Sequence, residues 1–264
     1  MVLFDWASRT QWLADVQNYA SSLLTSKTVR RLQKQRPDCW SDNFDWLQPQ
    51  DADSLFAELF YDHYSHIRCF HGARPLDVGS YLTDGILGQS SNTIEATFRK
   101  VFADLPKESL DRALDEFSDR KSSEQGKLWV LLEEKELVQH CGHYLIQGSE
   151  YVMALAASLC RIHRGEDYRL RLRDIGIPTI FEAHVPIDCF PDSQMISLTR
   201  SVLSGWGQFV TGNDLGFNSS PCLVLYRDIE PALIAGHTHP ARIRDPHFGF
   251  SQYSNPKVKC DHCV

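Results

Sequence analysis

Short strand-like segments separated by longer helical segments constrain the fold of this chain more than any other feature. Runs of branched and aromatic residues predict strands at 66–74, 127–134, 143–147, 177–187 and 221–227. Apolar residues at helical spacing predict helices at 11–36, 52–65, 92–120, 148–164 and 197–209, with a short helix over 75–86 that ends in a turn at Gly85. Because the predicted strands are too far apart in sequence for hairpins, the pattern predicts an α+β fold.

The predicted strands begin only at residue 66, so the chain divides into parts of different character. We expect a helical N-terminal part over 1–65, a mixed domain over 66–248 and a C-terminal tail over 249–264. A length of 264 residues allows one large domain or two small ones. The stretch 36–51 is rich in proline, aspartate and tryptophan, and we interpret it as an ordered connector.

Composition argues against several classes of protein. No apolar run approaches the roughly 18–20 residues of a membrane span, so we expect no membrane partner. The N-terminal segment carries Asp5 and Asp15 and no basic leader, which predicts a cytoplasmic protein without a secretory signal. The net charge of −7 argues against binding nucleic acid through a broad basic surface.

One short stretch is nevertheless basic. It ends the first predicted helical segment and contains Lys27, Arg30, Arg31, Lys34 and Arg36. We interpret it as a solvated helix face, and the alternative is a local contact with an anionic substrate or nucleic acid.

The eight cysteines fall into two groups. Six of them, beginning with Cys39, are widely spaced in the chain, which favours free thiols in a reducing compartment. Cys260 and Cys263 form a C-x-x-C pair, which can supply half of a tetrahedral zinc site, and His237 and His239 could complete it. We favour the alternative, a loosely ordered tail, and therefore expect no metal ligand in the chain.

Three segments combine residue types that could carry chemistry. Cys69-Phe70-His71-Gly72-Ala73-Arg74 would place an imidazole at a strand end beside a glycine that permits close approach. Gly142-His143-Tyr144-Leu145 precedes Gly148-Ser149-Glu150-Tyr151, which would present an aromatic ring and a hydroxyl at the start of a helix. In the strand 180–186, Glu182 would be costly if it were buried without a partner. Each segment also has a structural interpretation, as a core side chain, a serine helix cap or a solvent-facing glutamate.

Taken in order, these segments resemble the ADP-ribosyltransferase fold of the diphtheria-toxin and poly(ADP-ribose) polymerase type. Phe70-His71-Gly72-Ala73 stands where that family has a strand with His-Gly-Thr, and Gly142-His143-Tyr144-Leu145 stands where it has a strand with Gly-x-Tyr-Phe. Ser149 and Tyr151 match the serine and aromatic residue at the start of its next helix. The late strand resembles residues 221–234, including a trailing Pro-x-x-Ile. The resemblance covers roughly residues 66–248 and rests on the joint order of these short motifs.

The resemblance implies a mono-ADP-ribosyltransferase of bacterial toxin or defence type, which cleaves the bond between nicotinamide and ribose in NAD. His71 would hydrogen-bond the nicotinamide ribose, and Gly72 would offer backbone groups to the carboxamide. Tyr144 would stack on the nicotinamide ring, while Ser149 would help to hold the carboxamide and Tyr151 would add packing. The NAD-binding residues implied in this way are His71, Gly72, Ala73, Tyr144, Ser149 and Tyr151.

One departure from the family concerns its catalytic glutamate. Cys222 stands where that residue is usual, and Ala73 replaces the threonine. Family members without the glutamate transfer a single ADP-ribose or are inactive. Glu182 on the neighbouring strand, or Glu150, could instead stabilise the oxocarbenium-like transition state. The candidate catalytic residues are therefore His71, Tyr144, Glu182 and Cys222.

The implied partners are NAD, an acceptor that is a protein or a nucleic acid, and a cognate antitoxin. Water as the acceptor would make the protein an NAD glycohydrolase. One alternative is a catalytically degenerate module that binds NAD or ADP-ribose. Another is a metal-dependent hydrolase that uses His237, His239, His247 and the C-terminal cysteines, although the chain lacks a motif such as H-E-x-x-H.

Overall fold

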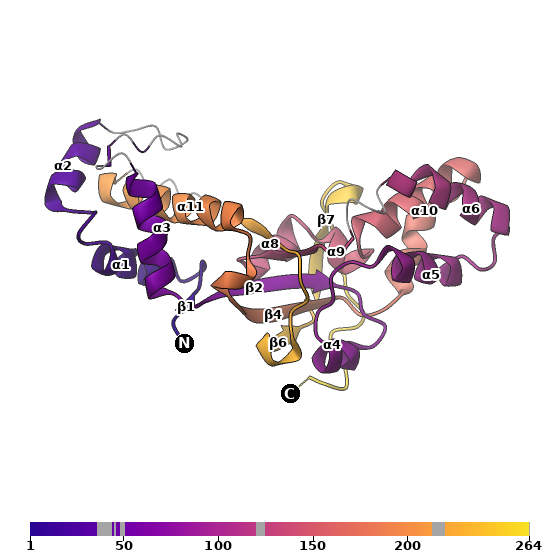
Figure 1. The fold of residues 1–264 in the computed structure, drawn as a ribbon. Helices are drawn as coiled ribbons and strands as arrows, with labels where there is room; N and C mark the ends of the chain where they lie inside the picture. The colour runs from indigo at the N-terminus through magenta and orange to yellow at the C-terminus, as the bar shows by residue number, and fades with distance from the viewer. Residues whose placement is uncertain (36–43, 45, 48–50, 120–124, 213–219, 264) are drawn as a thin grey trace. The chain divides into compact units, whose positions relative to one another are not determined.

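The computed structural model describes residues 1–35, 44, 46–47, 51–119, 125–212 and 220–263. Helices and strands mix throughout this part of the chain, which confirms the α+β class (Figure 1). Most of the connector predicted at 36–51 lies outside the described residues, as do Cys39 and Arg36. Within the described ranges, no helix is both long enough and apolar enough to cross a membrane.

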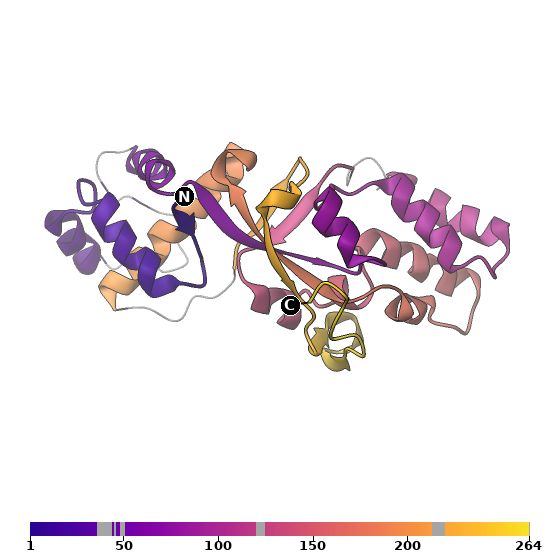
Figure 2. The same cartoon turned by 90° about the horizontal axis from the view of Figure 1, so that it is seen from below.

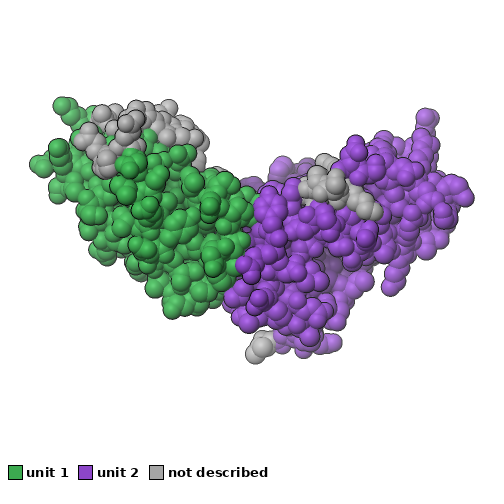
Figure 3. Space-filling model, viewed as in Figure 1, with its two compact units in different colours: residues 1–69, 184–224 green, residues 70–183, 225–264 purple. Residues whose placement is uncertain are grey.

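The chain forms two compact units, each built from two separate stretches of sequence (Figure 3). Unit 1 contains residues 1–69 and 184–224, and unit 2 contains residues 70–183 and 225–264. These units differ from the parts expected from the sequence, with boundaries at 65 and 248. The segment 184–224 belongs with the N-terminal helices, and the tail from residue 249 belongs with the domain that precedes it.

Aromatic side chains hold unit 1 together. Its elements are β1 (Leu3–Phe4), α1 (Arg9–Tyr19), α2 (Ser26–Gln35), α3 (Ala52–His63) and α11 (Asp192–Thr211). The ring of Phe4 is fully buried and lies 5.0 Å from Phe60 and 5.1 Å from Tyr64, centroid to centroid. Trp206 of α11 stacks on Trp46 at 6.3 Å. Because large aromatic side chains bury the most apolar area, these contacts dominate the core of unit 1.

A six-stranded sheet has the strand order β5-β3-β2-β4-β6, and β1 pairs with β2 outside this order. Figures 1 and 2 show β2, β4 and β6 of this sheet side by side. Its strands are β2 (His66–Ala73), β3 (Leu128–Leu131), β4 (Thr179–Pro186), β5 (Cys222–Leu225) and β6 (Ile234–Thr238). The β2–β3 and β4–β6 pairs are antiparallel, with Phe181 of β4 opposite His237 of β6. The strand that carries His71 is therefore central, with a neighbour on each side.

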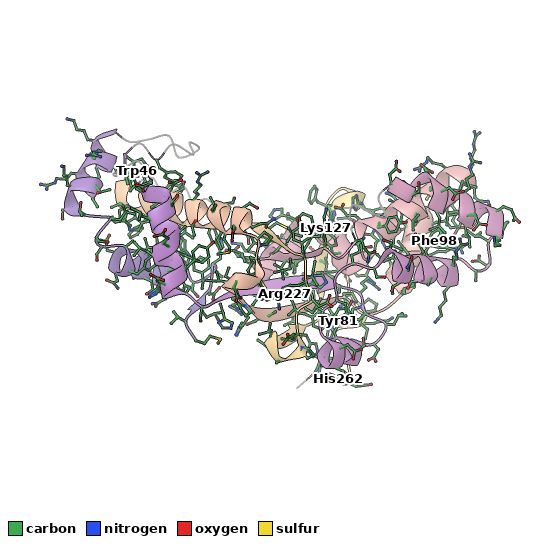
Figure 4. All side chains as sticks on the ribbon, viewed as in Figure 1. Trp46, Tyr81, Phe98, Lys127, Arg227 and His262 are labelled. Carbon is green, nitrogen blue, oxygen red and sulfur yellow. The ribbon has the colours of Figure 1, made fainter. Side chains whose placement is uncertain are left out.

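Unit 2 contains a helical core of its own. This core is formed by α5 (Ser91–Val101), α6 (Lys107–Glu116), α10 (Glu150–Ile162) and the 3-10 segment η1 (Tyr168–Asp174). Phe98 and Phe102 are fully buried in it, and Figure 4 labels Phe98 among these helices. The apolar spacing of the predicted helices at 92–120 and 148–164 is explained by this packing.

A second apolar cluster of unit 2 joins the sheet to two short helices and a hairpin. The helices are α8 (Glu134–Gln139) and α9 (His143–Ile146), and the hairpin is β7 (Arg242–Asp245) with β8 (Ser251–Ser254). Leu137 and Leu145 from the helices pack with Phe70 and Ile180 from the sheet and Ile243 from the hairpin.

The segment 143–147 forms a helical turn, so the strand predicted there is wrong. The backbone N–H of Gln147 donates to the carbonyl of His143 at 2.8 Å, as in a helix. Leu145 and Ile146 are adjacent and both fully buried, whereas a strand would send them to opposite faces. The strands β6, β7 and β8 were not predicted, because these short segments contain glycine, histidine, charged or uncharged polar residues rather than an apolar run.

Candidate functional site

His71 lies near the end of the central strand β2. Its Nδ1 is 2.9 Å from the backbone carbonyl of Trp129 in β3, so Nδ1 carries the proton and donates to this carbonyl. Burial lowers the pKa of His71, and the hydrogen bond to the carbonyl opposes this shift in part. The imidazole is therefore neutral near pH 7, and its Nε2 is an acceptor.

Gly72 packs closely against two leucine side chains, so the strand is not open to an approaching ligand on this side. A Cβ at this position would lie 2.9 Å from Leu137 Cδ2 and 3.3 Å from Leu145 Cδ2. The side of the strand left bare by the glycine is thus covered by α8 and α9. Ala73, which follows, is buried.

Arg74 ties the end of β2 to α9, a role that its sequence context does not indicate. Its guanidinium donates from Nη1 to the carbonyl of Leu145 at 2.9 Å. Nε donates to the carbonyl of Ile175 at 2.6 Å, and Nη2 donates to that of Arg173. Carbonyl acceptors far away in the sequence leave no local pattern, so no sequence signal marks this contact.

Tyr144 lies on α9 and is half-buried. Leu145, the next residue, contacts both the bare side of Gly72 and the guanidinium of Arg74. The structure therefore brings the two segments with His71 and Tyr144 together, although they are far apart in the sequence. The ring of His143 lies 4.1 Å from that of Tyr144, and burial lowers the pKa of His143 to about 4.

Ser149 and Tyr151 have structural roles at the start of α10. Ser149 is the N-cap, and its hydroxyl accepts a hydrogen bond from the backbone N–H of Val152. Tyr151 is 3% exposed in the helical core, and its hydroxyl is 3.2 Å from Glu95 Oε1. Burial and this carboxylate raise the pKa of Tyr151 to about 12. With so little exposed surface, Tyr151 offers no face to a ligand.

The candidate acidic residues lie in different places. Glu182 is half-buried in β4 opposite Gly236 of β6, at an irregularity of the pairing. Glu150 is exposed, and its Oε1 lies 3.7 Å from Nε2 of His143. Cys222 is exposed at the start of β5 and falls in unit 1, whereas the other candidate residues fall in unit 2.

The basic stretch predicted near residue 30 lies on α2 of unit 1. Lys27, Arg30 and Lys34 are exposed along this helix. Arg31 is half-buried instead, and its Nη1 donates to the carbonyl of Trp46 at 3.4 Å. The exposed side chains are as expected for a solvated helix face.

A second group of reactive side chains meets elsewhere in unit 2. His237, His239, Cys260 and Cys263 each offer one ligand atom, and these atoms all lie within 4.8 Å of one another. The two cysteines are free thiols. The tail that we expected to be loosely ordered thus lies beside β6.

No protein-family model matches the chain, and no curated protein matches it either. The site is therefore interpreted from its geometry. At the junction of β2 with α9, the segment that contains His71 contacts the segment that contains Tyr144. The two histidines and two cysteines near β6 form a separate cluster.

Proposed function

We propose that the protein binds NAD at the junction of β2 and α9 and acts as a mono-ADP-ribosyltransferase, as a toxin or effector in the cytoplasm. The carrying observation is the contact between these two segments. Leu145, next to Tyr144, covers Gly72 and accepts a hydrogen bond from Arg74. The two segments that carry the histidine and the tyrosine assigned to NAD by the resemblance are thus in contact with each other.

The protonation state of His71 suits this role. A neutral imidazole that donates from Nδ1 to the Trp129 carbonyl keeps Nε2 available as an acceptor for a ribose hydroxyl. Tyr144 would supply an aromatic face for the nicotinamide ring. Arg74, whose donors are taken by carbonyls, is a positioning residue rather than a ligand.

The reaction breaks the bond between C1′ of the ribose and the nicotinamide nitrogen. Nicotinamide leaves as a neutral molecule with the bonding electron pair. A lone pair of the acceptor then bonds to C1′, and the acceptor loses a proton. A carboxylate near the ribose would stabilise the positive charge that develops, and Glu182 is the candidate in unit 2.

Nicotinamide release from NAD tests this proposal. We expect His71→Ala and Tyr144→Ala each to reduce release by roughly tenfold or more, because each removes a direct contact with NAD. His140→Ala and Tyr226→Ala are matched controls, since both side chains are exposed in the wild type, and they should leave release unchanged.

The same assay separates the acceptors and the alternatives. Release that requires cell lysate indicates a transferase, and labelled NAD then identifies a protein or nucleic-acid acceptor. Release without lysate indicates a glycohydrolase. Saturable NAD binding without release favours the degenerate binding module, with Cys222 in place of the glutamate as the reason. The absence of both nicotinamide release and NAD binding would contradict the proposal.

Glu182→Gln tests the source of the carboxylate. If Glu182 stabilises the transition state, this variant should lose about 10²-fold in turnover while NAD binding is retained. Equal turnover in the variant and the wild type would remove Glu182 from the mechanism.

A further inference from the structure

The C-terminal cysteines and the two histidines of the β6 segment have the geometry of a closed metal site. Nε2 of His237 lies 3.3 Å from Sγ of Cys260 and 3.8 Å from Sγ of Cys263. The two sulfurs are 3.7 Å apart. With Zn–S bonds of about 2.3 Å and Zn–N bonds of about 2.0–2.1 Å, a tetrahedron has edges of about 3.8 Å between sulfurs and about 3.6 Å between sulfur and nitrogen. The observed separations are close to these values.

His239 supplies an independent indication. It is 9% exposed, and its Nδ1 lies 2.9 Å from the backbone carbonyl of Pro178. This contact places the proton on Nδ1 and leaves the Nε2 lone pair as the acceptor. Among the described residues, this buried Nε2 has no hydrogen-bond partner. A histidine that donates from one nitrogen to a carbonyl and keeps the other free is the usual arrangement of a metal ligand.

The backbone explains why the four residues meet. His237 lies in β6 and His239 follows directly after its last residue, and the two rings lie 5.2 Å apart, centroid to centroid. Cys260 and Cys263 are joined by a turn in which the N–H of Cys263 donates to the carbonyl of Cys260 at 3.2 Å. The N–H of Cys260 also lies 3.3 Å from Sγ of Cys263, so the turn holds the two sulfurs close together.

The tail is anchored before it reaches this turn. The side chain of Asn255 donates to the carbonyl of Pro240 at 3.1 Å and accepts from the N–H of Lys257 at 2.9 Å. Nζ of Lys257 donates to the carbonyl of Gly176 at 3.0 Å. The cysteines therefore lie beside the histidines because the preceding residues are fixed to unit 2.

We infer that His237, His239, Cys260 and Cys263 bind one zinc ion, which fastens the C-terminal segment to β6. Two thiolates and two imidazoles are a preferred ligand set for tetrahedral zinc. Two thiol protons are released on binding, and the two thiolates then balance the charge of Zn²⁺. Four protein ligands leave no open position, which favours a structural ion over the catalytic ion of a metal-dependent hydrolase. This inference does not depend on NAD chemistry.

The fastened turn also contacts α4 (Val78–Asp84). A Cβ on Gly79 would lie 2.7 Å from Nε2 of His262, so the backbone of α4 and the turn are in close contact. Tyr81 of α4 in turn stacks on Phe181 with ring centroids 4.6 Å apart, and Figure 4 labels both Tyr81 and His262. Zinc would thus fix the helix that follows the His71 strand as well as the tail.

Metal analysis of the full chain, purified under reducing conditions without a histidine tag, tests the inference. We expect about one zinc ion per chain in the wild type, and a loss of most of it in Cys260→Ser, Cys263→Ser and His239→Ala. Cys189→Ser and His262→Ala are the matched controls and should keep the zinc. Loss of zinc in His262→Ala with retention in His239→Ala would overturn the assignment of ligands.

A second measurement uses only the wild-type protein, so it does not depend on whether the variants fold. Wild-type protein stripped of metal is titrated with Co²⁺, and we expect the absorption bands of a tetrahedral cobalt site with thiolate ligands, which Zn²⁺ then abolishes. Thermal unfolding of the same stripped protein should occur at a lower temperature than unfolding after zinc is restored. Absence of zinc in the purified wild type, together with no response to Co²⁺, would overturn the inference.

Discussion

Two buried polar side chains of unit 2 differ in whether their polar atoms have hydrogen-bond partners. Asp245 is 1% exposed, and its Oδ2 lies 2.7 Å from Nη2 of Arg173. Its Oδ1 also accepts from the backbone N–H of His247 at 3.0 Å. The ring of His143 is buried as well, but neither of its nitrogens has a hydrogen-bond partner among the described residues. The carboxylate therefore has hydrogen-bond partners for both of its oxygens, whereas burial without a partner favours the neutral form of the imidazole.

Asp245→Ala should cost about 3–5 kcal/mol in the free energy of unfolding, because it leaves the half-buried Arg173 without its partner. Asp53→Ala is the matched control, since Asp53 pairs with the exposed Arg200 at 2.8 Å. A surface pair of this kind contributes about 0–1 kcal/mol. Urea unfolding of both variants measures the difference, and equal losses would contradict the distinction.

The low pKa of His143 should make stability depend on pH. The folded protein has a pKa of about 4 at this residue, whereas the unfolded chain has the ordinary 6.5. Between these values the unfolded state binds the extra proton, so stability is complete above pH 6.5 and falls toward pH 4, at up to about 1.4 kcal/mol per pH unit. His143→Gln should reduce this loss. Denaturant unfolding at pH 7.5 and pH 5 measures it, and an equal loss in variant and wild type would contradict the assignment.

At the scale of elements, α11 shows how one helix can complete a core distant in sequence. Its buried face carries Trp206, which stacks on Trp46, and Gly207, where a Cβ would lie 3.5 Å from Leu32 Cδ2 of α2. Phe209, near the end of the same helix, is exposed. The helix is therefore an integral part of unit 1 rather than a connector.

Trp206→Ala should destabilise the protein by about 3–5 kcal/mol, because it removes a large, fully buried ring. Phe209→Ala, on the same helix but 56% exposed, should change stability by less than about 0.5 kcal/mol. Denaturant unfolding followed by tryptophan fluorescence and circular dichroism measures both. Similar effects of the two substitutions would contradict the packing of α11.

Elements with a strong local signal could be predicted from the sequence. Long amphipathic helices such as α10 and apolar strands such as β4 were identified because their own residues specify them. The strand predicted at 143–147 failed because tertiary packing on Gly142, where a Cβ would lie 2.0 Å from the carbonyl of Arg244, decides its conformation. His71 was placed correctly on a strand because its own segment has a local strand pattern. The contacts of Arg74 depend on distant residues and have no local signature.

At the scale of the whole molecule, the chain leaves unit 1 at residue 69 and returns to it at residue 184. Unit 2 is interrupted in turn by residues 184–224. No boundary in composition marks these crossings, since the helices of both units have ordinary amphipathic patterns. This explains why the sequence pattern indicated a separate N-terminal part over residues 1–65, although the core of unit 1 also includes α11.

This interleaving affects how the protein is made. The ribosome must add residues 70–183 before α11 can reach its partners, which takes roughly 6–20 s at ordinary rates of synthesis. During that time the nascent N-terminal helices expose aromatic surface that the finished protein buries. Molecular chaperones would bind this exposed aromatic surface during the interval, and slow codons after residue 69 would prolong the exposure.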